Sequence, residues 1–301
     1  MTHHKGGAAP LKPRVLSHTP AELTSGPLHR LGEGIDKVVY ASDHWVVKRV
    51  RTPYDAIALI GIWKMLRTVA RFLPRRLGSR LMERPASQIR FLGALLRAPM
   101  WILPRSVWFT THMWQIWKLH HAQDVHGHGL AQSRLSGTSL IPETVTFPPT
   151  FIQIDEWPEW LAISEATERM EGTLQRRLDQ LAGAGSFEEL ELWLNRFLDL
   201  RRAGWQLGVF SVDAHLKNFG LSGDHVVLLD PGGLIDSWEE IERRLDSEHS
   251  QPPPHVRLGL AAMLSSRPDI AERFDARWKA TVNHAEVRRH WLATVPREHA
   301  G

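Results

Sequence analysis

Residues 208–234 constrain the fold most strongly, because a polar loop, a short apolar strand and a glycine-rich turn follow one another there. Asp213 and Asn218 lie five residues apart in the loop, and Asp230 follows Asn218 by twelve residues. The apolar run at 226–229 predicts a strand that ends immediately before Asp230. We therefore expect a strand–turn–strand unit that brings Asn218 and Asp230 close enough to share one metal ion.

The surrounding elements predict an α+β protein with two lobes. Residues 28–50 contain apolar runs separated by turns, and residues 151–170 contain two more, FIQIDE and WLAISEA, so both segments are predicted as strands. Residues 54–122 are predicted as helices broken by prolines, and residues 237–298 as mainly helical. We expect a bilobal fold, with an N-terminal antiparallel sheet lobe that carries a helical insertion and a mostly helical C-terminal lobe.

The clearest helix is predicted over residues 187–204, where large apolar side chains recur at helical spacing. Residues 123–150, which contain the sequence HGHG, are predicted as a loop. The expected organisation is a mobile leader at 1–27, an N-lobe at 28–170 with its insertion at about 54–122, and a C-lobe at 171–301.

The composition excludes several classes of protein. The 301 residues suffice for a two-lobed domain with a sizeable core. The absence of cysteine excludes disulfide bonds and thiolate metal sites. No uncharged apolar run reaches the ~18 residues of a transmembrane helix, and residues 1–14 lack the apolar stretch of a secretory signal. We expect a cytoplasmic protein.

The residues between 208 and 234 match the needs of γ-phosphoryl transfer. Mg²⁺ must bridge the phosphates and takes oxygen ligands, and a carboxylate must orient the attacking hydroxyl and accept its proton. A cation must hold the remaining phosphates, and backbone amides should cover them. With Asn218 and Asp230 sharing a metal, Asp213 would lie beside the acceptor hydroxyl.

This pattern resembles the protein-kinase-like superfamily, whose catalytic loop reads HRDxxxxN and whose metal-binding loop reads DFG. Here the first is SVD at 211–213 followed by Asn218, and the second is DPG at 230–232. The resemblance implies that Asp213 is the catalytic base and that Asn218 and Asp230 bind Mg²⁺. The DAH sequence that begins at Asp213 is also similar to the DxHxxN loop of aminoglycoside phosphotransferases and of bacterial lipopolysaccharide-core kinases.

Upstream residues fall in the order that this resemblance requires. Lys48, in WVVKRV, stands where the family's strand lysine binds the α- and β-phosphates. Gly32 and Gly34, in LGEGIDKVVY, would form the glycine-rich loop over the phosphates. The strand that resembles the hinge would present backbone groups to adenine from Glu165, Ala166 and Thr167. The resemblance spans residues 28–235 and implies ATP and Mg²⁺ as cofactors.

Several positions depart from conventional protein kinases. Ser211 replaces the histidine of HRD, and Pro231 replaces the phenylalanine of DFG. The glycine-rich loop lacks a third matching glycine, and no APE-like triplet follows the metal loop. The glutamate that pairs with the family's lysine is not evident: Glu83 is one candidate partner for Lys48, and Gln115 could substitute without charge. These departures favour an atypical kinase, and they leave open a pseudokinase that acts as a scaffold.

A basic block occupies residues 51–118, where twelve basic residues stand against two acidic ones and five tryptophans are interspersed. Such a segment suits an anionic membrane surface, and the same chemistry could bind nucleic-acid phosphates. Its many apolar residues fit a membrane interface better than a nucleic-acid groove. The alternative is that its apolar faces pack inside the protein and its arginines are solvated.

Four histidines gather at and before the HGHG sequence: His120, His121, His126 and His128. Four imidazoles could bind Zn²⁺ or Ni²⁺. The alternative is an exposed polar loop without a metal.

We therefore expect an ATP-dependent phosphotransferase that uses Mg²⁺ and transfers the γ-phosphoryl group to a hydroxyl acceptor. No motif identifies the acceptor, but a lipid- or sugar-linked hydroxyl suits the missing APE-like segment and the basic block. The expected partners are ATP, this acceptor and an anionic membrane surface, with a peripheral position at the inner face of the membrane.

Overall fold

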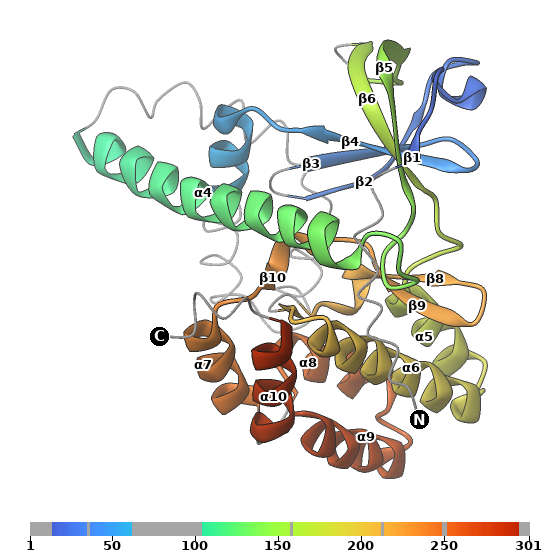
Figure 1. Cartoon of the computed structure of the whole chain (residues 1–301), viewed down its shortest axis with the longest axis vertical. Coiled ribbons are helices and arrows are strands. Elements are labelled where there is room, and N and C mark those ends of the chain that lie inside the picture. The colour runs from blue at the N-terminus through green and yellow to red at the C-terminus, as the bar shows by residue number, and fades with distance from the viewer. Residues whose placement is uncertain are drawn as a thin grey trace, which may run out of the picture. The chain divides into compact units, whose positions relative to one another are not determined.

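The computed structural model describes residues 14–34, 37–61, 104–156, 159–211, 214–248 and 252–294. The chain forms two compact units (Figure 1). Unit 1 contains Met1–Ser17, Gln123–Phe147 and Thr167–Gly301, and unit 2 contains His18–Ala122 and Pro148–Ala166. The predicted α+β class is confirmed, because a multistranded sheet and long helices are both present.

One six-stranded sheet has the order β1-β5-β6-β4-β3-β2. Its strands are β1 (Arg14–Val15), β2 (His29–Glu33), β3 (Lys37–Ala41), β4 (Trp45–Val50), β5 (Thr144–Gln153) and β6 (Trp160–Glu168). β2, β3 and β4 form an antiparallel meander, whereas β1 joins β5 in parallel. Side chains of a strand point alternately to its two faces, and in β3 the apolar Val38 and Tyr40 share one face and are both buried.

Residues 14–27, which composition assigns to a mobile leader, adopt defined structure. β1 lies there, followed by a 3₁₀ turn, η1 (Ala21–Leu23), in which Leu23 is fully buried. The Glu22 carboxylate accepts the N–H of His44 at 3.2 Å and the hydroxyl of Ser42 at 3.2 Å. These contacts offset the low apolar content of the segment. Residues 1–13 lie outside the described part of the chain.

The long helix α4 (Pro104–Leu130) runs through the HGHG sequence and continues into a π-helical turn, η3 (Ala131–Leu135) (Figure 1). The loop predicted over residues 123–150 is therefore wrong from 123 to 135, and also from Thr144, where β5 begins. Tertiary packing is the reason: Gly127 is buried, and a Cβ there would overlap the main-chain oxygen of Pro231. Glycine weakens an isolated helix, but here it permits a close approach to another segment.

Unit 1 is mainly helical after β6. Its helices are α5 (Leu174–Gly183), α6 (Phe187–Gln206), α7 (Trp238–Glu248), α8 (Pro254–Met263), α9 (Pro268–Thr281) and α10 (His284–Thr294). The helix predicted over residues 187–204 is α6, and its apolar stripe is buried as expected. Phe197 on this stripe packs edge-on against Phe219, with ring centroids 4.8 Å apart, and lies 6.4 Å from the Trp278 ring. α6 therefore passes through the core of unit 1.

A buried ion pair lies beside this core. Nη2 of Arg201 on α6 donates to Oε2 of Glu248 on α7 at 2.9 Å, and the indole of Trp278 donates to the Glu248 carbonyl oxygen at 3.1 Å. The guanidinium of Arg201 also lies over the Trp278 ring, 4.5 Å from its centroid. Burial raises the pKa of Glu248 and lowers the pKa of Arg201, because each charged form loses hydration.

Candidate functional site

The strand–turn–strand unit predicted around Asn218 and Asp230 is present in unit 1. β8 (Phe219–Ser222) and β9 (His225–Leu228) form an antiparallel hairpin. The ladder extends by one further bond, in which the main-chain oxygen of Asn218 accepts the N–H of Leu229 at 2.8 Å. Asn218 therefore lies opposite the residue that immediately precedes Asp230.

Asp230 caps a single 3₁₀ turn, η5 (Pro231–Gly233), and its Oδ1 accepts a main-chain N–H of that turn at 3.4 Å. Proline is well tolerated at the first position of such a turn, where an N–H would have no helical partner. After the turn, β10 (Leu234–Ile235) pairs antiparallel with β7 (Phe210–Ser211). This pairing holds the chain that enters the predicted catalytic loop beside the chain that leaves the Asp230 turn.

Asp230 lies in a group of side chains that could hold a metal ion, together with Asp124 and His128 of α4. One ligand atom from each of the three lies within 4.8 Å of the other two. Nδ1 of His128 donates to the main-chain oxygen of Asp124 at 2.8 Å. The neutral ring then carries its proton on Nδ1, and the free lone pair is on Nε2. The carboxylate oxygens suit Mg²⁺ or Mn²⁺, and the imidazole also suits transition metals. The donor set therefore fits a divalent cation.

Close packing between α4 and the Asp230 turn sets this geometry. A Cβ at Gly127 would overlap the main-chain oxygen of Pro231 and come within 2.9 Å of the carbonyl carbon of Gly232. A Cβ at Gly232 would in turn overlap Oδ1 of Asp124. One glycine in each segment thus allows the helix and the turn to meet, and it holds Asp124 against the turn that begins at Asp230.

Asp236 anchors the chain that follows β10. Nη2 of Arg134 lies 3.1 Å from one carboxylate oxygen of Asp236, and Nε2 of His126 lies 3.2 Å from the other. Arg134 also donates to the main-chain oxygen of Gly208 at 2.8 Å, and the Trp291 indole donates to the main-chain oxygen of Asp236 at 2.6 Å. These bonds give the candidate site a fixed frame.

Two of the residues predicted to bind phosphates lie near each other in the sheet of unit 2. Gly32 of β2 and Lys48 of β4 both pair with Val39 of the strand between them, which separates their backbones by about 10 Å. A register shift beside Gly32 marks a β-bulge. The N–H of Gly34 donates to the main-chain oxygen of Lys37 at 2.7 Å, which closes the connection between β2 and β3.

The strand predicted to face adenine is β6, which lies between β5 and β4 in the sheet. Glu165 is exposed and Ala166 is buried. Oγ1 of Thr167 lies 3.3 Å from Oγ1 of Thr144 on β5. β6 thus neighbours β4, the strand that carries Lys48.

Several predicted features lie outside the described residues. Asp213, the predicted base, falls in the gap at 212–213, and Glu83 falls in the gap at 62–103 with most of the basic block. Gln115, the neutral alternative partner of Lys48, is exposed on α4. Among the helices of the described ranges, none combines the length and the apolarity of a membrane span. The partner of Lys48 and the role of the basic block stay predictions.

Sequence reasoning missed Asp124 and His128 as neighbours of Asp230. It left open Zn²⁺ or Ni²⁺ binding by four histidines, but among the described residues the group of possible metal ligands contains one of them, His128. His126 contacts Asp236, and the His121 ring stacks on the Trp117 ring at 5.1 Å. The sequence signal for this pair was the four-residue spacing of Asp124 and His128. That spacing brings two side chains together only in a helix, and a loop was predicted there.

Comparison with known proteins assigns no family to the chain. No family model and no curated protein matches it. Among solved structures, it is similar to Rv3197 of Mycobacterium tuberculosis in complex with erythromycin, with 15% sequence identity and a TM-score of 0.35. The match covers 71% of this chain and 48% of that chain, so this chain spans about half the length of that protein. A likeness this weak carries no argument about fold or function.

Proposed function

We propose that this protein is an ATP-dependent phosphotransferase of an atypical protein-kinase-like type. The observation that carries the proposal is the position of Asp230. It follows a hairpin whose ladder reaches back to Asn218, and it lies in one group of ligating side chains with Asp124 and His128. Oxygen ligands at the end of a hydrogen-bonded hairpin suit Mg²⁺, the ion that bridges the phosphates of ATP in such enzymes.

The proposed ligands of Mg²⁺ are Asn218 and Asp230, and Asp124 and His128 complete or orient this set. Lys48 binds the α- and β-phosphates, beneath the turn that contains Gly32 and Gly34. The pairing of Gly32 and Lys48 with the same strand supports this role, because it keeps a cation near the glycine-rich turn. Adenine recognition is assigned to the strand that contains Glu165, Ala166 and Thr167.

The proposed reaction needs one proton transfer and one exchange of bonds at phosphorus. The acceptor oxygen bonds to the γ-phosphorus as Asp213 takes the hydroxyl proton. The bond from the γ-phosphorus to the β–γ bridging oxygen breaks, and ADP leaves with that electron pair. When bound, Mg²⁺ neutralises negative charge on the phosphates. The protein contributes mainly position and electrostatic stabilisation.

For the acceptor we propose a lipid- or sugar-linked hydroxyl, presented at an anionic membrane surface on the cytoplasmic side. The support comes from the sequence: no APE-like triplet follows the metal loop, and residues 51–118 carry twelve basic residues against two acidic ones. Anionic lipid attracts such a segment, and tryptophan favours the headgroup region.

A nucleotide-binding scaffold is the second candidate function. Ser211 replaces the catalytic-loop histidine, and Pro231 is held in a 3₁₀ turn where conventional kinases carry a phenylalanine. Mg²⁺-dependent ATP binding, without transfer to any lipid or sugar acceptor and without ATP hydrolysis, would support this candidate.

Replacement of Asp230 tests the proposed function. Asp230→Ala should lower Mg²⁺-dependent ATP turnover by roughly 100-fold or more, because it removes a ligand of the bound ion. Asp224→Ala is the matched control, since Asp224 is an exposed carboxylate in the turn of the same hairpin. Circular dichroism verifies that both variants fold. Wild-type turnover by Asp230→Ala would contradict the proposal.

A further inference from the structure

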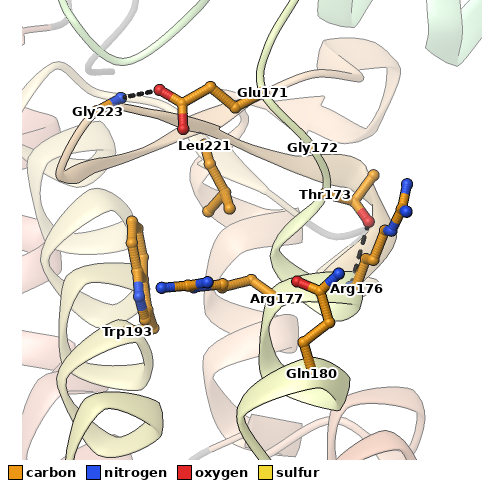
Figure 2. A pocket seen from close by; sticks show the side chains of 9 residues that line it. All are labelled: Glu171, Gly172, Thr173, Arg176, Arg177, Gln180, Trp193, Leu221 and Gly223. Atoms are coloured by element: carbon orange, nitrogen blue, oxygen red, sulfur yellow. Dashed lines mark hydrogen bonds between the residues drawn. The ribbon is translucent and has the colours of Figure 1, made fainter.

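A cavity of about 370 Å³ lies in unit 1 against the β8–β9 hairpin. Figure 2 shows its walls: residues 171–173, the first turns of α5, Trp193 of α6 and Leu221 of β8. A volume of this size is typical of sites that bind small molecules. None of the residues that line it has a role in the proposed phosphoryl transfer.

Backbone hydrogen bonds make one wall of this cavity rigid. The N–H of Glu171 donates to the main-chain oxygen of Leu221 at 3.2 Å, and the N–H of Leu221 donates to that of Gly172 at 3.1 Å. The Glu171 carboxylate accepts the N–H of Gly223 at 3.0 Å (Figure 2). The segment 171–173 therefore pairs with the hairpin, and this wall is formed before any ligand arrives.

α5 supplies the polar wall. Thr173, Arg176, Arg177 and Gln180 are spaced by three or four residues and therefore lie along one face of the helix. The side chain of Arg177 extends toward Trp193 (Figure 2) and donates to Glu189 at 2.5 Å. This bond holds the pKa of Glu189 below its usual range. The charge of Arg177 is therefore already matched within the protein.

Arg176 differs from Arg177 in this respect. Within the described ranges, no hydrogen bond or ion pair engages its guanidinium group, while its main-chain N–H is bound to the Thr173 hydroxyl. Arg176 is exposed and lines the cavity. An arginine in this state can bind a carboxylate or a phosphate with two parallel hydrogen bonds. The cavity thus has one cation available for a ligand.

The opposite wall is aromatic and apolar. Trp193 is 5% exposed, and its indole N–H donates to Glu189 at 3.4 Å. The guanidinium of Arg196 lies over the same ring, 4.6 Å from the centroid. Trp193 is therefore fixed in place, and with Leu221 it forms the apolar part of the cavity lining.

The cavity is separate from the candidate metal site. Leu221, its contribution from β8, lies three residues beyond Asn218, about 10 Å along a strand. The cavity and the group formed by Asp124, His128 and Asp230 share no residue. A ligand here would not occupy the proposed site of phosphoryl transfer.

We propose that this cavity binds a small organic anion, with a phosphate or carboxylate group on Arg176 and a planar or apolar body against Trp193. Isothermal titration calorimetry without ATP or metal tests it with phenyl phosphate, benzoate, inorganic phosphate and phenol. At least one aromatic anion should bind more tightly than phenol and than inorganic phosphate. A preference for phenyl phosphate or for benzoate identifies the anionic group.

Arg176→Gln should weaken this binding at least tenfold, because it removes the unpaired cation. Arg202→Gln is the matched control, since Arg202 is an exposed arginine of α6 outside the cavity. Asp230→Asn should bind the anion like the wild type, which separates this result from the test of the proposed function. Any of three results would overturn the proposal. They are no binding of either aromatic anion, binding of phenol as tight as that of the anions, and equal anion affinity in Arg176→Gln and the wild type.

Discussion

Two groups of charged side chains in unit 1 are built in opposite ways. Arg201 and Glu248 are buried and carry opposite charges, so each compensates the other. Asp124, His128 and Asp230 instead bring two carboxylates and an imidazole within 4.8 Å. Within the described ranges, no lysine or arginine forms an ion pair with Asp230. The first group is complete within the chain. The second places two carboxylates close together, and like charges disfavour each other, so we propose that a cation from solution stabilises it.

The largest effect is expected from breaking the compensated pair. Glu248→Ala leaves the Arg201 guanidinium buried and unpaired, which should lower the free energy of unfolding by about 3–5 kcal/mol. Nη1 of Arg201 is already buried without a hydrogen bond, so no other acceptor is at hand in the described structure. Chemical denaturation measures the change.

Asp269→Ala is the control for this variant. It breaks two exposed pairs, with Arg267 at 2.8 Å and with Arg273 at 3.1 Å. Exposed pairs contribute little, so denaturation of this variant should resemble that of the wild type. If the two variants lost equal stability, burial would not be what distinguishes the pair formed by Arg201 and Glu248.

A smaller effect is expected where α4 meets the Asp230 turn. Gly127→Ala places a methyl group against the main-chain oxygen of Pro231 and should cost about 1–3 kcal/mol of unfolding free energy. Gly129→Ala, two residues along the same helix, meets no atom within 4 Å and should be neutral or stabilising by up to ~1 kcal/mol. Equal denaturation midpoints for the two variants would show that this close approach is absent in solution.

The smallest effect concerns an exposed pair that joins α6 to α9. Arg273 donates to both carboxylate oxygens of Glu191, at 2.9 and 2.8 Å, and these bonds lower the pKa of Glu191 from 4.5. Because the folded pKa lies below the unfolded one, this stability is present above pH 4.5 and is lost as the pH falls through the folded pKa.

Glu191→Gln should therefore lower the unfolding free energy at neutral pH by less than ~1 kcal/mol. The difference from the wild type should shrink as the pH falls below 4.5 and through the lowered pKa of Glu191. Urea denaturation across this range measures the difference. A difference that grows on acidification would have the wrong sign for a lowered pKa.

The hairpin and α6 could be predicted because their signals are local. The apolar run at 226–229 and the flanking polar residues define β9 and the following turn without reference to other segments. In α6, large apolar residues recur at helical spacing. Such local patterns predict the structure well because the apolar residues that form the pattern are the same residues that are buried in the folded chain.

The C-terminal part of α4 could not be predicted in this way. Histidine and glycine are weak helix formers, and the contact that favours a helix at Gly127 comes from Pro231, far along the chain. Asp124 and His128 lie near Asp230 only because of that contact, so this proximity could not be predicted without the tertiary structure.

Binding of Mn²⁺ in the absence of nucleotide tests the central claim most directly, with free ion measured by electron paramagnetic resonance. The wild type and Asp224→Asn should bind Mn²⁺ alike. Asp230→Asn and Asp124→Asn should each bind at least tenfold more weakly, because each removes a carboxylate ligand from a donor set suited to this ion. Equal affinity in all four proteins, or no binding by the wild type, would contradict the account.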